Sequence, residues 1–329
     1  MESALTIAMP VYNRAEFFPE ALASALNQTV PTRVLVVDNA STRFDFEKAV
    51  RDTGNPRVSY HRNATNLGMV ENWNQCLRLA GTRWVSILHD DDVLYPQAVD
   101  WLLKGIATLP ERGLYFGLDD AMDEASRVTR NKVESDPAFD EIVPRDYVLR
   151  NQFCACGFAI DRQRALAIGG YDRRLKMTSD WDLYCRMCVR HGAVRINRVV
   201  GAYREPIARE SGTSAYAVSG ILLPSIALQR ARNLREYRQV TGEALPVSHR
   251  VEQAEMAQRL LSQIGFKMTR RGFRNASLYA ALACPKNRWK ALAFRVSPRL
   301  FCRLMVWYSY LARLKSPHPS PRPPTPSPR

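Results

Sequence analysis

A short apolar segment that ends in three carboxylates constrains this chain more than any other stretch. Residues 84–88 read Trp-Val-Ser-Ile-Leu, an uncharged run rich in β-branched and aromatic side chains. Such a run is typical of a strand buried on both faces, as in the parallel sheets of α/β proteins. After one histidine, His89, the chain continues into Asp90, Asp91 and Asp92. The segment therefore predicts a buried strand with a carboxylate cluster at its end.

Three adjacent carboxylates repel one another unless a cation balances their charge. Hard divalent cations such as Mg²⁺ and Mn²⁺ take oxygen ligands, usually one or two carboxylates together with substrate phosphates. Ligands of open α/β sheets also bind beyond the carboxyl ends of the strands. The cluster therefore predicts a metal–phosphate site. Taken alone, it fits equally well an acidic loop that caps the next helix, because Asp is common in turns and helix first turns.

The first 200 residues alternate strands with helices. Apolar runs predict strands at 5–9, 33–37, 58–61, 84–88, 114–117, 153–160 and 194–200. Helical spacing predicts helices at 17–28, 44–51, 69–80, 96–109, 162–168 and 180–191. Segment 119–146 is polar and poorly periodic, and it is predicted to be a long loop. The alternation predicts an α/β fold with a doubly wound, mostly parallel sheet flanked by helices.

The charge is distributed unevenly along the 329 residues. The net charge is +15, and residues 220–329 hold 20 Lys and Arg against 4 Asp and Glu. We therefore predict an α/β domain at 1–218, a basic helical extension at 219–315, and a disordered Pro/Ser-rich tail at 316–329. No stretch approaches the ~20 apolar residues of a membrane-spanning helix.

The basic extension also contains aromatic residues, among them Trp289 and Trp307. This mixture fits peripheral contact with an anionic membrane surface, and it fits a solvated helical bundle equally well. No nucleic-acid-binding motif is recognisable, so no nucleic-acid partner is expected.

The seven cysteines are scattered and odd in number, which favours a reducing, cytoplasmic location over a disulfide framework. Cys154, Cys156, Cys185 and Cys188 have spacings that a zinc site could use. Cys185 and Cys188 fall in an apolar helical pattern, however, which favours buried free thiols.

Four motifs occur in order along the predicted α/β domain, and together they carry a family resemblance. They are Pro-Val-Tyr-Asn after the first strand, Val-Val-Asp-Asn-Ala-Ser at the second strand, the Asp cluster, and Ser-Asp-Trp-Asp-Leu at residues 179–183. A looser fifth match is Asn66-x-Gly68 with Asn74. The chain resembles the family 2 glycosyltransferases, nucleotide-sugar-dependent enzymes of the Rossmann-like GT-A fold, over residues 5–200. The C-terminal third lies outside the resemblance.

The resemblance implies a nucleotide site at the strand ends. Its expected residues are Pro10, Val11, Tyr12, Asn13, Asp38, Asn66, Asp90 and Asp91. Tyr12 would stack on the base, and Asp38 would accept hydrogen bonds from the base or the ribose. Without the resemblance, Tyr12 is more simply an aromatic at the edge of the core and Asp38 a turn residue.

The resemblance also implies a divalent cation, Mn²⁺ or Mg²⁺, at the Asp cluster. Asp92 is expected to bind the cation directly, and Asp90 is the expected second metal ligand. Asp90 or Asp91 is expected to contact the ribose or to support the metal ligand. A shifted alignment would put His89 at the first acidic position and pair Asp91 with Asp92. Such a cation would neutralise the charge that develops on the diphosphate leaving group.

Asp180 is the expected catalytic residue, the general base that removes the acceptor hydroxyl proton. By position alone, Asp180 and Asp182 could simply complement the N-terminus of their helix, and Asp182 is expected to be structural. Gly170, Tyr171 and Asp172 are expected to shape the acceptor side. Arg204, predicted in the loop after the last strand, could reach the diphosphate or remain a solvated residue.

These expectations together predict an inverting glycosyltransferase that moves one sugar. The donor would be a nucleoside diphosphate sugar, with UDP-sugar as the default, and the acceptor a glycan or lipid-linked glycan in cell-surface polysaccharide or lipopolysaccharide synthesis. The Gln-x-x-Arg-Trp motif of processive synthases is absent. The alternatives are a basic scaffold with a remnant domain, and a sugar-phosphate nucleotidyltransferase. The latter needs a Gly-rich loop where this chain has Pro-Val-Tyr-Asn-Arg.

Overall fold

The computed structural model describes residues 4–150, 156–205 and 222–245. The predicted helices beyond residue 245, the predicted tail, and Cys154 lie outside these ranges. The predicted strand at 153–160 is described only from residue 156 onward.

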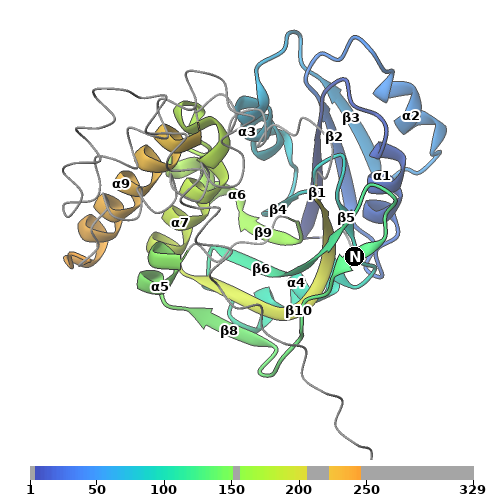
Figure 1. Cartoon of the computed structure of the whole chain (residues 1–329). Helices are drawn as coiled ribbons and strands as arrows, with labels where there is room; N and C mark the ends of the chain where they lie inside the picture. The colour runs from blue at the N-terminus through green and yellow to red at the C-terminus, as the bar shows by residue number, and fades with distance from the viewer. Residues whose placement is uncertain (1–3, 151–155, 206–221, 246–329) are drawn as a thin grey trace, which may run out of the picture. The chain divides into compact units, whose positions relative to one another are not determined.

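The centre of the fold is a ten-stranded sheet (Figure 1). Its strands are β1 Leu5–Val11, β2 Arg33–Asp38, β3 Val58–Arg62, β4 Trp84–Ile87, β5 Val93–Leu94, β6 Leu114–Met122, β7 Val128–Arg130, β8 Phe139–Ile142, β9 Phe158–Asp161 and β10 Ala193–Arg204. The order across the sheet is β3-β2-β1-β4-β9-β6-β10-β5, with β7 beside β6 and β8 beside β10.

Most strands of the sheet run in one direction. Strand β1 pairs in parallel with both β2 and β4, β2 with β3, and β6 with β10. Strand β9 is antiparallel to its neighbours β4 and β6. All four residues of β4 are buried, as the uncharged run at 84–88 predicts. The predicted mostly parallel α/β sheet is therefore confirmed.

Helices connect and flank the strands. They are α1 Phe18–Leu26, α2 Phe46–Asp52, α3 Met69–Leu79, α4 Ala98–Thr108, α5 Pro144–Arg150, α6 Arg162–Ala167, the 3-10 helix η1 Arg173–Thr178, α7 Ser179–His191 and α9 Leu222–Thr241. Helix α3 packs against β1 and β2, and α4 packs against β6 and β10. None of the described helices combines the length and apolar character needed to cross a membrane.

Residues 119–146 do not form the predicted loop. Strand β6 continues to Met122 because its second half pairs with the extended end of β10, where Ala121 lies opposite Tyr203. Strands β7 and β8 and the start of α5 account for much of the rest. The β6–β10 pairing joins residues about 80 positions apart and the β8–β10 pairing joins residues 51 to 57 positions apart, so the local polar composition gave no sign of either. The prediction for this segment was wrong.

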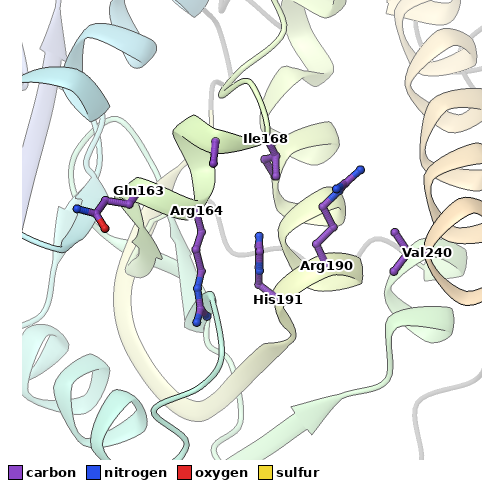
Figure 2. A pocket seen from close by; sticks show the side chains of 7 residues that line it. Gln163, Arg164, Ile168, Arg190, His191 and Val240 are labelled. Atoms are coloured by element: carbon purple, nitrogen blue, oxygen red, sulfur yellow. The ribbon is translucent and has the colours of Figure 1, made fainter.

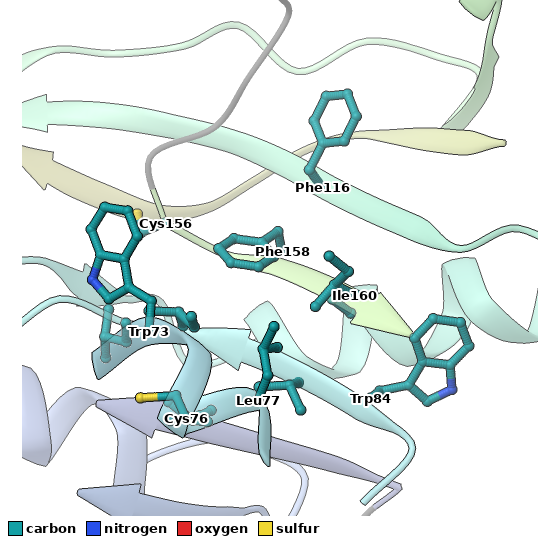
Figure 3. Close-up of a cluster of buried hydrophobic side chains, with 14 of the residues drawn as sticks. Trp73, Cys76, Leu77, Trp84, Phe116, Cys156, Phe158 and Ile160 are labelled. Atoms are coloured by element: carbon teal, nitrogen blue, oxygen red, sulfur yellow. The ribbon is translucent and has the colours of Figure 1, made fainter. Parts of the chain in front are cut away.

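The main core joins the central strands to the helices that flank them, with buried side chains from α1, α3, α4 and α7. Figure 3 shows Trp73, Cys76 and Leu77 of α3 in the same cluster of buried side chains as Phe158 and Ile160 of β9. The Trp84 and Tyr115 rings meet edge to face, with centroids 5.3 Å apart. Such aromatic pairs contribute about 0.5–1.5 kcal/mol beyond the area that they bury. Cys185 and Cys188 are buried free thiols of α7, and burial raises the pKa of Cys188 to about 12.

Helix α9 belongs to the same compact unit as the sheet from Ser225 onward. Tyr237 is 5% exposed and is part of the main core, and the Glu236 carboxylate pairs with Arg190 of α7. The predicted domain boundary after residue 218 therefore precedes a helix that packs on α7. The boundary itself remains a prediction.

Candidate active site

Three segments that follow parallel strands come together at one edge of the sheet. Val11 lies opposite Asp38 in the β1–β2 pair, and the Asn39 N–H donates to the Val11 carbonyl (3.0 Å). On the other side of β1, the Leu88 N–H donates to the Ala8 carbonyl (3.0 Å). Because β1, β2 and β4 end at the same edge, the predicted nucleotide residues after β1 and β2 lie beside the Asp cluster after β4.

Asp38 is fully buried and bound to three donors of the protein. Its Oδ1 accepts from the Ser41 N–H (2.8 Å), and its Oδ2 accepts from the Tyr60 hydroxyl (2.7 Å) and Arg62 Nη1 (2.7 Å). Burial and the Asp38 contact together raise the pKa of Tyr60 to about 12. Since a carboxylate accepts about four hydrogen bonds, Asp38 retains room for one more donor.

Asn13 shapes the turn after β1. It adopts a positive φ of 57°, and its Oδ1 accepts from the Thr42 N–H (2.7 Å) and the Arg43 N–H (3.0 Å). The preceding residue, Tyr12, is 44% exposed, so its ring is accessible to a ligand. Pro10 and Val11 are buried in β1.

An amide network ties the loop after β3 to the end of β2. Asn66 Oδ1 accepts from Asn39 Nδ2 and from the Gly68 N–H, both at 2.8 Å. Asn39 Oδ1 in turn accepts from the Leu67 N–H (2.8 Å) and Asn63 Nδ2 (3.2 Å). Sequence reasoning singled out Asn66 but missed Asn39 and Asn63, because amide pairs between distant segments leave no periodic signal.

Two carboxylates of the cluster are paired with one guanidinium. Arg14 Nη2 contacts Asp90 Oδ1, and Arg14 Nη1 lies 2.8 Å from Asp91 Oδ2. Asp90 is 6% exposed, and burial raises its pKa to about 6 despite the opposing effect of Arg14. Arg14 is a missed site residue; its place one position beyond the Pro-Val-Tyr-Asn motif was the available signal.

Asp90 and Asp91 are paired with Arg14, whereas Asp92 contacts no cationic side chain in the described part of the chain. It is 1% exposed, and its Oδ1 accepts from the Arg204 N–H (2.9 Å). Its Oδ2 is buried and has no hydrogen-bond partner among the described residues. Burial, together with the charge of Asp91, raises the pKa of Asp92 well above its usual range. A buried carboxylate oxygen of this kind fits a divalent cation, which would restore the ionised form.

The donor set around Asp92 limits what such a cation would bind. Within the described residues no group of three His, Cys, Asp or Glu side chains is arranged to hold a metal. Mg²⁺ is usually held by one or two carboxylates, with its other positions filled by water and substrate phosphates. The residues present therefore fit a cation shared with a phosphorylated ligand.

Arg204 lies at the end of β10, not in the predicted loop, because β10 continues four residues past the predicted strand end. Arg204 is 4% exposed, so it is a buried residue and not a solvated one. Its Nε donates to the Asp91 carbonyl (2.8 Å), its Nη2 lies 2.6 Å from Glu20 Oε2, and the guanidinium lies over the Phe17 ring. In this structure Arg204 holds the backbone of the Asp cluster.

Asp180 lies in the first turn of α7 and is partly buried. Its Oδ1 accepts from the Trp181 N–H (2.8 Å), and burial raises its pKa to about 6. Asp182 is fully buried, and Arg186 Nε donates to its Oδ2 (2.8 Å). This buried contact agrees with the structural role predicted for Asp182.

The turn at 169–172 packs inward. Tyr171 is 2% exposed, its hydroxyl lies 3.0 Å from that of Tyr184, and its backbone N–H donates to Asn74 Oδ1 (2.8 Å). Gly170 has a φ of 61°, and its carbonyl accepts from Arg186 Nη2 (2.7 Å). Asp172 binds Arg174. These contacts give the three predicted acceptor-side residues structural partners.

A row of rings connects the Asp cluster with this turn. The His89 and Trp73 centroids lie 5.4 Å apart, and the Trp73 and Tyr171 centroids also lie 5.4 Å apart. Burial lowers the pKa of His89; the Asp91 carboxylate opposes this shift and the Arg14 charge adds to it. Trp73 was predicted only as part of an apolar helix face, and its link to the site was missed.

A cavity of about 410 Å³ adjoins the Asp38 contacts and is lined by Ser41, Thr42, Arg43, Phe44, Asp45, Glu47, Tyr60 and Arg62. A second cavity, about 600 Å³, is lined by residues of α6, α7 and α9, including Arg164, Arg190 and His191 (Figure 2). The second cavity shares no residue with the predicted site.

The sheet, its helices and the acidic edge define an α/β protein of the GT-A fold, the fold of nucleotide-sugar-dependent glycosyltransferases. The profile described as glycosyl transferase family 2 matches residues 6–168, which contain the ends of β1, β2 and β4. The chain belongs to this family of glycosyltransferases, as its motifs predict.

Curated relatives share the sequence at a low level. WcaA of Escherichia coli (strain K12), named for a proposed glycosyl transferase role in colanic acid biosynthesis, is 25% identical over 194 residues, covering 57% of this chain and 67% of WcaA. An uncharacterized glycosyltransferase of Haemophilus influenzae is 26% identical over 187 residues, covering 56% of this chain and 61% of that protein. The matches thus span about two thirds or less of these relatives.

Solved structures establish the fold. Residues 1–349 of TarS from S. aureus, in complex with UDP-GlcNAc, give a TM-score of 0.63 at 16% identity over 94% of this chain and 89% of that one. The mannosyltransferase PcManGT from Pyrobaculum calidifontis, in complex with GDP-Man and Mn²⁺, gives a TM-score of 0.51 at 18% identity over 96% and 87%.

Proposed function

We propose that this protein is an inverting glycosyltransferase that moves one sugar from a nucleoside diphosphate donor to a hydroxyl of a glycan or lipid-linked glycan. The observation that carries the proposal is the buried, unpartnered Oδ2 of Asp92 at the edge where β1, β2 and β4 end. A buried carboxylate oxygen without a donor is costly, and a ligand that brings a cation would remove that cost.

The nucleotide would lie along the same edge. Tyr12 offers an exposed ring, Asp38 has room for one more donor, and Asn13 orders the turn between them. A UDP-sugar is the default donor. TarS was solved with UDP-GlcNAc and PcManGT with GDP-Man, which supports a nucleotide-sugar and leaves both bases as candidates for the test.

Asp92, with Asp90 as the second carboxylate and Asp91 beside them, would hold a divalent cation, Mn²⁺ or Mg²⁺. When bound, such a cation supplies charge neutralisation for the diphosphate leaving group. Mn²⁺ is present in the PcManGT structure, which supports metal use among similar folds. Arg204 keeps the Asp cluster in place through the Asp92 carboxylate and the Asp91 carbonyl.

Asp180 would act as the general base. In the proposed step the acceptor oxygen forms a bond to the anomeric carbon on the face opposite the diphosphate. The bond from that carbon to the phosphate oxygen breaks, the nucleoside diphosphate leaves with the bonding electrons, and the acceptor proton passes to the Asp180 carboxylate. A base with a pKa near 6 is ionised at neutral pH and is more basic than an ordinary Asp.

Two observations support the proposed acceptor, the basic C-terminal residues and the name of a relative. The excess of 16 positive charges in residues 220–329 suits peripheral contact with an anionic membrane, where a lipid-linked acceptor would be found. WcaA is named for a polysaccharide pathway, which supports a glycan acceptor. A peripheral position on the cytoplasmic face of a membrane follows from the same charge.

The experiment is calorimetric titration of UDP, GDP and dTDP into the full chain, with and without Mn²⁺. We expect Mn²⁺-dependent binding of one nucleotide in the wild type and its loss in Asp92→Asn. Asp161→Asn, at another buried carboxylate, is the matched control and should bind as the wild type does. Failure of every nucleotide to bind under both conditions would instead favour a non-catalytic scaffold.

A further inference from the structure

Two residues of α9 hold the segment that leads into Asp180. The Ser225 hydroxyl contacts the Leu175 carbonyl and lies 2.8 Å from Thr178 Oγ1. Arg232 Nη1 contacts Asp172 Oδ2, and Arg232 Nε lies 3.6 Å from Asp182 Oδ1. Since Asp172 and Asp182 lie on either side of Asp180 in the chain, α9 fixes this segment before and after the proposed base.

The two residues act from one face of the helix. Ser225 and Arg232 are seven residues apart, which is close to two α-helical turns, so their side chains leave the same side of α9. Figure 1 shows α9 alongside α7. Thr178 occupies the N-cap position of α7 but makes no capping bond within the helix, and its hydroxyl lies within hydrogen-bond distance of the Ser225 hydroxyl. The start of α7 is therefore held by α9 in place of a local cap.

The carboxylates that Arg232 contacts are largely buried and are shared with other guanidinium groups. Asp182 is fully buried; Arg186 satisfies its Oδ2, while Oδ1 has no hydrogen-bond partner among the described residues and lies 3.6 Å from Arg232 Nε. Asp172 also binds Arg174, so Arg232 is the contact that joins Asp172 to α9. A buried carboxylate that loses a nearby cation is driven to move or to take up a proton. A movement of Asp182 would displace the first turn of α7, which carries Asp180.

We propose that Arg232 of α9 is a positioning residue for the reaction: it sets the place of Asp180 through Asp172 and Asp182, assisted by Ser225. This inference rests on the proposed function, in which Asp180 is the base. By this inference α9 contributes to the reaction through the position of Asp180, and Arg232 acts without contacting the reacting atoms. A misplacement of about 1 Å in a catalytic group can cost on the order of a hundredfold in rate.

The first measurement is independent of activity. Hydrogen exchange of the peptide covering residues 173–184 is compared among the wild type, Arg232→Met, Arg232→Lys and Arg190→Met. Arg190 is the matched control because it also joins α7 to α9, through Glu236, but at the opposite end of α7. We expect faster exchange in this peptide for Arg232→Met only. Unchanged exchange in Arg232→Met would overturn the inference whatever the activity.

The second measurement is kinetic, using UDP-glucose and GDP-mannose as probe donors and rates normalised to calorimetric binding sites. We expect kcat of Arg232→Met to fall tenfold or more with nucleotide affinity unchanged, partial recovery in Arg232→Lys, and no change in Arg190→Met. Ser225→Ala, which removes one hydroxyl, should lower kcat several-fold and replaces Arg232→Met if that variant does not fold.

The outcomes separate the two proposals. An inactive Asp180→Asn together with unchanged kcat in Arg232→Met and Ser225→Ala would overturn the positioning role alone. An Asp180→Asn variant as active as the wild type would overturn the base assignment of the proposed function. In that case a faster-exchanging Arg232→Met would show only a structural contact, and the positioning role would also be rejected.

Discussion

At the scale of the residue, two carboxylates of the site are held in surroundings that disfavour their charge. Burial raises the pKa of Asp180 to about 6 and that of Asp92 well above its usual range. An ionised carboxylate is better solvated at the protein surface, so burying either charge lowers the free energy of unfolding. Active sites commonly contain carboxylates shifted in this way.

The shifted pKa of Asp180 has a direct consequence for activity. The proposed base works only when ionised, so kcat should fall as the pH drops through about 6, about two units above the fall expected for an ordinary Asp. The measurement is kcat from about pH 5 to pH 8 in the wild type. A kcat that stays constant over this range would contradict the prediction and would mean that another group limits the rate.

The raised pKa of Asp180 also makes the free energy of unfolding depend on pH. Because the folded-state pKa lies above the unfolded value, the stabilisation linked to this group is present below about pH 4 and is lost as the pH rises through about 6. Asp180→Asn should therefore raise the free energy of unfolding at pH 7 by roughly 1–3 kcal/mol, and by less at pH 5. Urea unfolding measures both values. Asp52→Asn, at an exposed carboxylate, should change neither by more than about 0.5 kcal/mol.

At the scale of the element, the turn between α6 and η1 is fixed by a side chain of α3. A Cβ on Gly170 would lie 2.5 Å from Asn74 Oδ1, the atom that accepts from the Tyr171 N–H. Gly169 also has a positive φ but meets nothing within 4 Å. The two neighbouring glycines therefore share a backbone requirement and differ in the space around them.

This difference gives a matched pair of variants. Gly169→Ala should cost about 1–2 kcal/mol for its left-handed backbone alone. Gly170→Ala should cost a further 1–3 kcal/mol or so, because Asn74 must move. Denaturant unfolding of both variants tests this. Equal losses in the two variants would mean that Asn74 does not constrain the turn.

Elements with a strong local pattern could be predicted from the sequence. The uncharged run of β4 and the apolar stripe of α7 identify those elements, and the position of Asp92 after a buried strand identifies it as a candidate ligand. The strands β7 and β8 could not be predicted. Strand β8 pairs with β10, 51 to 57 positions away, and β7 has only three residues, all exposed, so neither has a local apolar pattern. The contact between Arg204 and Asp92 could not be predicted either, because it joins residues 112 positions apart.

At the scale of the whole molecule, the sheet and α9 share one compact unit although 17 residues separate β10 from α9 in the chain. Asn233 and Gln229 of α9 are 1% and 5% exposed, and Tyr237 joins the core. The charge step at residue 220 predicts a boundary before α9. Composition reports a change of charge, whereas the packing of a helix depends on which side chains face inward, so the packing of α9 could not be predicted from the charge step.

Two truncated chains test this organisation. A chain ending at Val247 should unfold cooperatively and bind nucleotide, since it keeps α9. A chain ending at Val218 should lose several kcal/mol of stability, because burying one Tyr-sized side chain contributes about 2–3 kcal/mol and α9 buries more than one. Thermal unfolding compares the two. Equal stability would show that α9 adds nothing to the fold.

The seven-residue interval between Ser225 and Arg232 also restricts how this sequence can diverge. One residue inserted between them would turn Arg232 by about 100° around the axis of α9 and detach it from Asp172 while Ser225 stayed in place. If Arg232 positions Asp180 as proposed, descendants of this chain should therefore conserve the number of residues between Ser225 and Arg232 even where the residues in between change.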